Sequence, residues 1–161
     1  WILSVLKSEN IPATFFLIGE NIERFPELFK KIKDDGHHIG NHSYSHLNGW
    51  LTNCKNYIKD VEKCQILMPK NKLFRPPFGK ISPLQIRKLK KKYKIIMWDI
   101  LSYDFLEKDE NIFRKNILNN IEDGSIVVFH NNQKSYEILK KELKDIICGL
   151  KKKGYIFSNA W

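Results

Sequence analysis

Cysteine is scarce in this chain of 161 residues, and none of its three cysteines belongs to a Cys-x-x-Cys pair. A zinc site built from thiolates is therefore not expected. Cys54 and Cys64 fall in one predicted helix, roughly 15 Å apart along its axis. The Cα atoms of a disulfide lie within about 7 Å of each other, so we expect both cysteines to be small core residues.

Long apolar runs are also absent. No stretch of the sequence approaches the length of a membrane-spanning helix, and the chain contains no signal-peptide pattern. Hydrophobic residues nevertheless make up 42% of the chain, which is enough to build a packed core. We therefore expect a folded domain without a membrane span, and we expect it to be a monomer.

Acidic residues are outnumbered, because 28 Lys and Arg face 18 Asp and Glu and give a net charge of +10. Such a charge favours anionic partners, among them nucleic acids and acidic glycans. The lysines, however, occur in runs such as "LKKKYK" and "GLKKKGY", which are typical of solvated helix faces and ends. No nucleic-acid-binding motif is present. We expect no nucleic-acid partner and keep a basic nucleic-acid-binding domain only as a remote alternative.

Apolar segments with strand character alternate with amphipathic helical segments along the chain. The pattern predicts strands at residues 11–19, 37–41, 72–75, 93–98, 125–130 and 155–157. It predicts helices over residues 26–35, 53–68, 82–93, 109–120 and 136–153. This alternation is typical of an α/β fold with a parallel sheet covered by helices, either closed like a barrel or open and doubly wound. No linker or repeat interrupts it, so residues 1–161 are expected to form one domain.

Four of the predicted strands are followed directly by polar, ionisable or rigid residues. Because the carboxyl ends of parallel strands meet at one edge of a sheet or barrel, we expect these residues to line a single site. They are Asn41, His42 and His46; Arg75, Pro76 and Pro77; Asp99 and Asp104; and His130, Asn131 and Asn132.

Four of the five histidines lie within the eleven residues "GHHIGNHSYSH". His42 and His46 are spaced i, i+4, so on a helical turn their imidazoles would share one face and could bind one metal ion. A surface or capping pair is the alternative. A zincin protease is disfavoured, because Ser43 stands where that motif requires glutamate. We expect His37 to be a hydrogen-bonded, partly buried structural residue and assign no role to His38.

At this point the motifs resemble a known family. "GHHIGNHSYSH", "RPPFG", "WDILSYDF" and "IVVFH" are similar, in order and spacing, to motifs two to five of the polysaccharide deacetylases, the NodB homology domains of carbohydrate esterase family 4. The resemblance implies a distorted (β/α) barrel with a divalent metal, most often Zn²⁺, in an Asp-His-His site. It also implies hydrolytic removal of N-acetyl or O-acetyl groups from a glycan partner such as peptidoglycan or a chitin-like polymer.

The resemblance assigns roles to individual residues. His42 and His46 match the metal-binding histidines of motif two. Arg75 matches the arginine that orients the catalytic aspartate in the family. His130 matches the general acid of motif five, and Asp104 matches the motif-four aspartate that supports this acid.

Three further residues match substrate-binding positions of the family. Phe78 would line the groove and offer its backbone N–H to the oxyanion, Trp98 belongs to motif four, and Val128 would contact the acetyl methyl group. Two positions depart from the common pattern. Leu101 replaces a frequent aspartate, and Asn131 replaces a frequent acidic residue after His130.

The largest departure concerns motif one, a Thr-Phe-Asp-Asp-Gly strand end that supplies the family's base aspartate and third metal ligand. The stretch Asp34-Asp35-Gly36 ends a predicted helix, so we do not assign it to this motif. We expect the chain to be truncated before motif one and to lack the first barrel strand. On its own it should deacetylate feebly or not at all. The alternative is a non-catalytic glycan-binding pseudoenzyme. The resemblance suggests the bacterial cell envelope or secretion, with the cytoplasm as the alternative.

Overall fold

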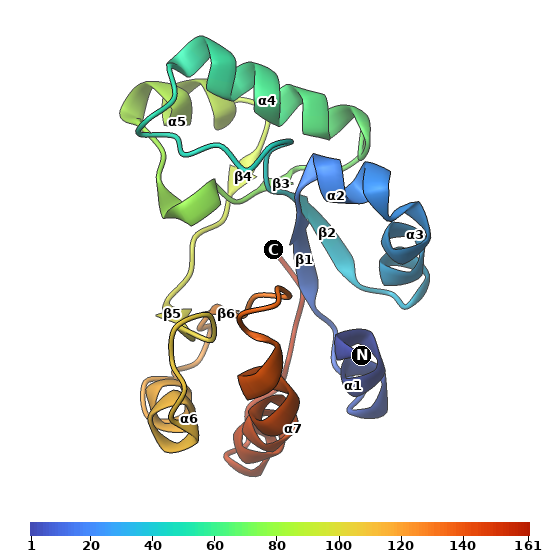
Figure 1. Ribbon diagram of the computed structural model, residues 1–161, viewed down its shortest axis with the longest axis vertical. Helices are drawn as coiled ribbons and strands as arrows, with labels where there is room; N and C mark the ends of the chain where they lie inside the picture. The colour runs from blue at the N-terminus through green and yellow to red at the C-terminus, as the bar shows by residue number, and fades with distance from the viewer. The chain divides into compact units, whose positions relative to one another are not determined.

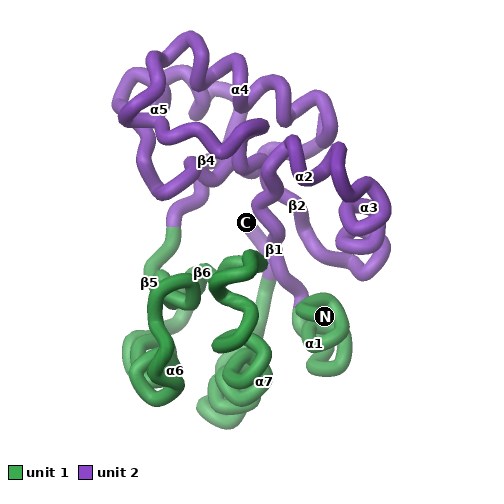
Figure 2. The backbone as a smooth tube through the Cα atoms, in the orientation of Figure 1, with its two compact units in different colours: residues 1–11, 98–158 green, residues 12–97, 159–161 purple.

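The computed structural model describes residues 1–161, and the chain divides into two compact units. Unit 1 contains residues 1–11 and 98–158, and unit 2 contains residues 12–97 and 159–161; Figure 2 shows the two in different colours. Each unit has parallel strands and helices of its own, labelled in Figure 1. No helix combines the length and apolar character needed to cross a bilayer.

Unit 2 is built on a parallel four-stranded sheet in the order β1-β2-β3-β4. The strands are β1 (Thr14–Leu17), β2 (His38–Asn41), β3 (Leu73–Phe74) and β4 (Lys94–Ile95). The helices between them are α2 (Gly19–Arg24), α3 (Pro26–Asp34), α4 (Cys54–Ile66) and α5 (Pro83–Leu89), with a 3₁₀ turn at Pro77–Gly79. Helices α4 and α5 lie side by side (Figure 1). The predicted alternation of strands and helices is confirmed here.

Two helices of unit 2, α4 and α5, begin where the sequence provides side-chain caps. The Asn53 side chain accepts a hydrogen bond from the Asn56 N–H at 3.0 Å, and Ser82 and Gln85 form a reciprocal capping box at the start of α5. The apolar faces of the helices of unit 2 pack in two clusters: Tyr57, Val61, Phe74, Leu89 and Tyr93; and Ile22, Cys64 and Met68. Cys64 is fully buried as predicted. Cys54 is only half-buried, because it occupies the first turn of α4, so its core assignment was wrong.

Unit 1 contains α1 (Ile2–Ser8), β5 (Ile100–Leu101), α6 (Glu110–Leu118), β6 (Val127–Val128) and α7 (Tyr136–Lys152). Strands β5 and β6 pair in parallel, and α6 packs against α7. The Asp109 carboxylate caps α6 by accepting hydrogen bonds from the N–H groups of Asn111 and Ile112. One buried apolar cluster of the unit consists of Ile100, Phe113, Ile117, Ile138, Leu139, Ile146 and Leu150.

Two strand predictions were wrong in detail. Of the strand predicted at 93–98 only β4 (Lys94–Ile95) is formed, and β5 (Ile100–Leu101), which follows it, was not predicted. The predicted strand at 155–157 is absent: Ile156 is 93% exposed, and the Tyr155 hydroxyl donates to the Ile121 carbonyl instead. A short apolar triplet becomes a strand only where a neighbouring strand supplies hydrogen-bond partners. Helix α2 was not predicted, because its six residues offer little apolar periodicity.

His37 is buried, and neither of its ring nitrogens has a hydrogen-bond partner. The predicted burial of His37 is confirmed, but the prediction that it is hydrogen-bonded was wrong. Its ring packs 5.3 Å from that of Phe15. Burial lowers the pKa of His37 below its usual 6.5, an effect that the nearby Asp35 carboxylate opposes and the Lys31 ammonium reinforces.

This buried ring should make folding stability depend on pH. Because the pKa of His37 is lower in the folded than in the unfolded chain, the unfolded chain binds more protons in slightly acidic solution. The free energy of unfolding should therefore fall as the pH drops through 6.5. The His37→Phe substitution should reduce that slope in urea unfolding series at several pH values, whereas His38→Phe, at an exposed neighbour, should not. Equal slopes in all three proteins would contradict this expectation.

Candidate active site

His42 and His46 lie together in the loop that follows β2. Their ring centroids are 4.9 Å apart, with an angle of 61° between the ring planes. The predicted helical turn is absent, since residues 42–46 form an irregular loop in which Ser43 and His46 have positive φ angles of 63° and 56°. The two rings are therefore brought together by left-handed backbone turns rather than by helical periodicity.

Polar side chains from the end of β2 and from α4 fix the shape of this loop. The buried Asn41 accepts a hydrogen bond from the Ser43 N–H at 2.9 Å. The Asp60 carboxylate accepts hydrogen bonds from the N–H groups of Tyr44 and Ser45 at 3.0 and 3.1 Å, and from the Ser45 hydroxyl at 3.0 Å. Sequence reasoning missed Asp60, because a single carboxylate on a helix gives no signal of its contact with a loop fifteen residues away.

The backbone carbonyl of Arg75 contacts His42 of the histidine pair, and the Arg75 side chain is buried within unit 2. The His42 Nδ1 atom lies 2.7 Å from the Arg75 carbonyl oxygen. The Arg75 guanidinium donates to the carbonyls of Ile96 and Met97 at 3.2 and 2.9 Å and lies 4.1 Å from the Phe16 ring. Burial lowers the pKa of Arg75 to about 10, so the side chain stays cationic at neutral pH.

Phe78 adds an aromatic ring beside the histidines. It has a positive φ of 58°, a conformation that non-glycine residues rarely adopt and that is often found at functional sites. Its side chain is 58% exposed, and its ring lies 4.5 Å from that of His46. The buried Pro76 and Pro77 precede it and restrict the backbone at this point.

The paired imidazoles fit two ligands of a divalent metal ion. A nitrogen that donates to a carbonyl carries its ring's proton, so the contact of His42 Nδ1 with the Arg75 oxygen leaves the lone pair on Nε2. Such a bond from the second ring nitrogen is typical of metal-ligating histidines. Two imidazoles that share a tetrahedral ion have donor atoms about 3.4 Å apart, which agrees with rings separated by 4.9 Å. The structure contains no cluster of three or more His, Cys, Asp or Glu side chains suited to a metal.

Asp104 and His130 form a second polar group, within unit 1. Asp104 is fully buried, and its two oxygens accept hydrogen bonds from His130: Oδ1 from the ring Nδ1 at 2.8 Å and Oδ2 from the backbone N–H at 2.6 Å. The His130 side chain is 36% exposed, and its ring packs edge-on against Phe105 at 5.0 Å. The buried aspartate thus fixes the orientation of an imidazole whose other edge reaches solvent. Sequence reasoning did not identify Phe105.

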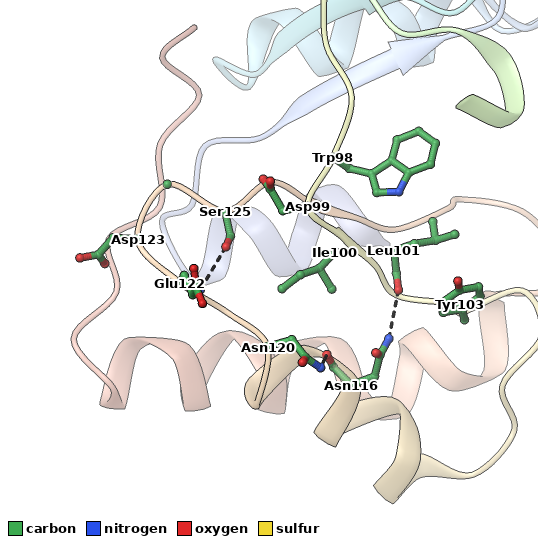
Figure 3. A pocket seen from close by; sticks show the side chains of 11 residues that line it. Trp98, Asp99, Ile100, Leu101, Tyr103, Asn116, Asn120, Glu122, Asp123 and Ser125 are labelled. Atoms are coloured by element: carbon green, nitrogen blue, oxygen red, sulfur yellow. Dashed lines mark hydrogen bonds between the residues drawn. The ribbon is translucent and has the colours of Figure 1, made fainter. Parts of the chain in front are cut away.

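Val128 and Trp98 also lie in unit 1. Val128 is buried in β6, where it pairs with Leu101 of β5. Trp98 lines a cavity of about 730 Å³, together with Tyr103 and polar side chains from α6 and the loop before β6 (Figure 3). The predicted site residues are therefore found as two groups, one in each unit. His42, His46, Arg75 and Phe78 make up the first, and Asp104 and His130 make up the second.

Parallel strands alternate with helices, a pair of imidazoles follows one strand, and an Asp–His pair follows two others, so the chain is an α/β protein with ionisable groups at the carboxyl ends of its strands. A family model described as "Polysaccharide deacetylase" matches residues 1–97. The chain belongs to that family, and the resemblance drawn from the four motifs is confirmed. The fold is the distorted (β/α) barrel type of carbohydrate esterase family 4, as solved structures of similar proteins show.

Individual relatives agree with this assignment. The chain is 35% identical to a peptidoglycan-N-acetylglucosamine deacetylase of Bacillus cereus, over 97% of this chain and 59% of that protein. A crystal structure of a peptidoglycan N-acetylglucosamine deacetylase in complex with 4-naphthalen-1-yl-N-oxidanyl-benzamide matches with a TM-score of 0.92 and 33% identity, over 98% of this chain and 77% of that one.

A pseudoenzyme of the same family is also similar. The structure of a family 4 pseudoenzyme from Bacillus anthracis matches with a TM-score of 0.87 and 26% identity, over 97% of this chain and 56% of that one. The chain thus spans less than two thirds of the length of both the Bacillus cereus relative and this pseudoenzyme.

Proposed function

We propose that the chain provides the metal-binding histidines and the general acid for hydrolytic deacetylation of an N-acetylated or O-acetylated polysaccharide, peptidoglycan or a chitin-like glycan. The observation that carries the proposal is the pair of imidazoles 4.9 Å apart, with His42 Nδ1 held by the Arg75 carbonyl. Membership in the polysaccharide deacetylase family supports the reaction class. The names of the similar deacetylases support peptidoglycan as the substrate.

In this proposal His42 and His46 hold a divalent ion, most often Zn²⁺ in the family. When bound, such an ion lowers the pKa of a water ligand toward about 7 and polarises the acetyl carbonyl. Arg75, buried and cationic, provides a fixed positive charge that can orient a carboxylate. Phe78 presents its exposed ring to the sugar and its backbone N–H to the developing oxyanion.

His130 is the proposed general acid. An amine leaves an acetyl group poorly unless it is protonated, and imidazole is suited to donate a proton near neutral pH. Asp104 accepts the Nδ1 proton of His130, so the transferable proton is carried on Nε2. The carboxylate also stabilises the cationic ring before it donates. Trp98 and Val128 complete the proposed contacts, with the sugar and with the acetyl methyl group respectively.

Two imidazoles without a third ligand should give a slow catalyst. A missing first-coordination-sphere carboxylate weakens metal binding, and a missing base typically costs about 10²–10⁴ in rate. Because no third metal-suited side chain joins the histidines in the structure, we expect these 161 residues to deacetylate at most feebly. A glycan-binding pseudoenzyme is the second candidate, supported by the similarity to the Bacillus anthracis pseudoenzyme.

Acetate release tests the proposal directly. The protein is incubated with chitooligosaccharides or with peptide-free peptidoglycan strands, with added Zn²⁺ or with a chelator, and acetate and new amino groups are quantified. We expect slow acetate release that requires metal and is lost in His130→Ala. If the protein binds these glycans but takes up no metal and releases no acetate, the pseudoenzyme is the better account. If it neither binds nor deacetylates them, the proposed substrate class is wrong.

A further inference from the structure

The loop between His46 and α4 exposes large apolar side chains to solvent. Trp50 is 66% exposed and the neighbouring Leu51 is 86% exposed. Leaving an indole in water forgoes the stabilisation that its burial would contribute. Scattered exposed apolar residues are common on protein surfaces and need no explanation, so the case for a function depends on how this loop is held.

The backbone of this loop is fixed by contacts with the next loop of unit 2. The Gly49 N–H donates to the Lys80 carbonyl at 3.1 Å, and the buried Gln85 side chain donates to the carbonyls of Gly49 and Thr52 at 2.8 and 3.1 Å. A Cβ atom at Gly49 would lie only 2.3 Å from the Lys80 oxygen, so the two loops approach as closely as glycine permits. The exposed indole is therefore presented by a well-held loop.

A cation accompanies the indole. The Lys80 Nζ atom lies 5.3 Å from the centroid of the Trp50 ring, within cation–π range. Lys80 forms no salt bridge within the chain. The indole ring and the ammonium group thus lie side by side, and no carboxylate of the chain neutralises the ammonium charge. The chain as a whole has a net charge of +10.

The same two segments carry residues of the candidate active site. His46 lies four positions before Trp50, and Phe78 lies two positions before Lys80. The rings of His46 and Phe78 are in contact at 4.5 Å. The Trp50–Lys80 pair is therefore continuous along the chain with the group proposed to hold the metal.

We propose that Trp50 and Lys80 form a binding subsite for a carboxylate-bearing hexosamine of the glycan substrate, a sugar other than the one that is deacetylated. The C–H groups on one face of a pyranose ring carry partial positive charge and stack on the π-face of the indole. The Lys80 ammonium binds the carboxylate. This inference rests on the proposed function, because it takes a glycan as the substrate, and it narrows the preferred glycan to an acidic one.

Binding measurements with two glycans of equal length test this subsite. The probes are tetra-N-acetylchitotetraose, which is uncharged, and a peptide-free peptidoglycan tetrasaccharide, in which every second sugar carries a carboxylate. Titrations followed by NMR or calorimetry are made in the presence of a chelator, so that metal binding does not contribute. Trp50→Ala should weaken binding of both glycans by about 3–10-fold, and Trp50→Tyr should restore most of it. Lys80→Gln should weaken only the acidic glycan, by about 2–5-fold, and added salt should mimic this loss.

Matched controls keep the test specific. Ile66→Ala removes a comparably exposed apolar side chain at the opposite end of α4, and Lys92→Gln removes a surface lysine that pairs with Glu62; both should bind like the unchanged protein. Circular dichroism confirms that each variant is folded. If Trp50→Ala and Lys80→Gln bind both glycans normally while acetate release persists, the subsite is wrong and the proposed function stands. If the unchanged protein binds neither glycan and releases no acetate, the proposed function fails as well.

A lipid surface would be attracted by the same combination of indole and cation. Vesicles of phosphatidylcholine with and without phosphatidylglycerol distinguish this outcome. If Trp50→Ala and Lys80→Gln lose vesicle binding but keep glycan binding, the surface docks on membranes and the glycan subsite is overturned. No binding of either kind of vesicle, with glycan binding reduced in both variants as described, supports the subsite.

Discussion

His42→Ala should weaken zinc binding by the protein by about 100-fold or more. Structural zinc sites with four ligands contribute about 10–16 kcal/mol, so each ligand accounts for several kcal/mol. Only two imidazoles meet in the loop after β2, so loss of one leaves a single histidine, which competes poorly with water for the ion. The measurement is a competition titration with a chromophoric chelator, together with the metal content of protein recovered after gel filtration.

His38→Ala is the matched control, because this imidazole is exposed and lies in the same segment, four residues before His42. It should bind zinc like the unchanged protein, and His46→Ala should behave like His42→Ala. If His42→Ala retains the zinc content of the unchanged protein, the ion is bound elsewhere and the ligand assignment is wrong. A protein that takes up no zinc at all would instead argue against the metal site itself.

The histidine pair illustrates what the sequence could and could not predict. The short spacing in "GHHIGNHSYSH" correctly indicated that the two rings meet, but a helical turn was the wrong reason. The loop is shaped by hydrogen bonds to Asn41 and to Asp60, and these override the local backbone preference. Such bonds join residues far apart in sequence, so no periodicity within the loop reveals them.

Contacts between residues far apart in sequence also shape the exposed loop at Trp50, and the sequence did not predict them. Gln85 was predicted to lie in a helix, and as a capping residue it behaves as its sequence context indicates. Gln85 also donates hydrogen bonds to the carbonyls of Gly49 and Thr52, which lie more than thirty residues away in the sequence. The sequence around Gln85 gives no indication of these two hydrogen bonds. The predicted strands were longer than the observed ones. An apolar run indicates which residues can be buried, but it does not indicate which of them form hydrogen bonds with a neighbouring strand.

The Asp–His pair of unit 1 was predictable only through the family resemblance. From residue order alone, Asp104 was one of several polar residues that follow strands, and nothing separated it from Asp99. The structure separates them clearly. Asp99 accepts one hydrogen bond from the Ile126 backbone, whereas Asp104 accepts two from His130, one from its backbone and one from its ring.

Asp104→Asn should therefore move the ring proton of His130 from Nδ1 to Nε2. A carboxylate accepts both hydrogen bonds, but the amide of asparagine offers one oxygen and one NH₂ group. The backbone N–H of His130 cannot give up its proton, so the amide oxygen should face it and the NH₂ group should face Nδ1. The imidazole can change tautomer and should do so. Nitrogen-15 NMR of the labelled imidazole at alkaline pH measures the tautomer without requiring any catalysis.

The same substitution should reduce acetate release by about 10²–10⁴-fold, because the general acid loses both its orientation and the charge that stabilises its cationic form. Asp99→Asn is the matched control: it alters a carboxylate that binds only backbone, and it should leave the His130 tautomer and the rate unchanged. Adding Asp104→Asn to His130→Ala should cost nothing further, because residues that act as a unit are not additive. A protein with Asp104→Asn that keeps its proton on Nδ1 and its full rate would show that Asp104 serves folding alone.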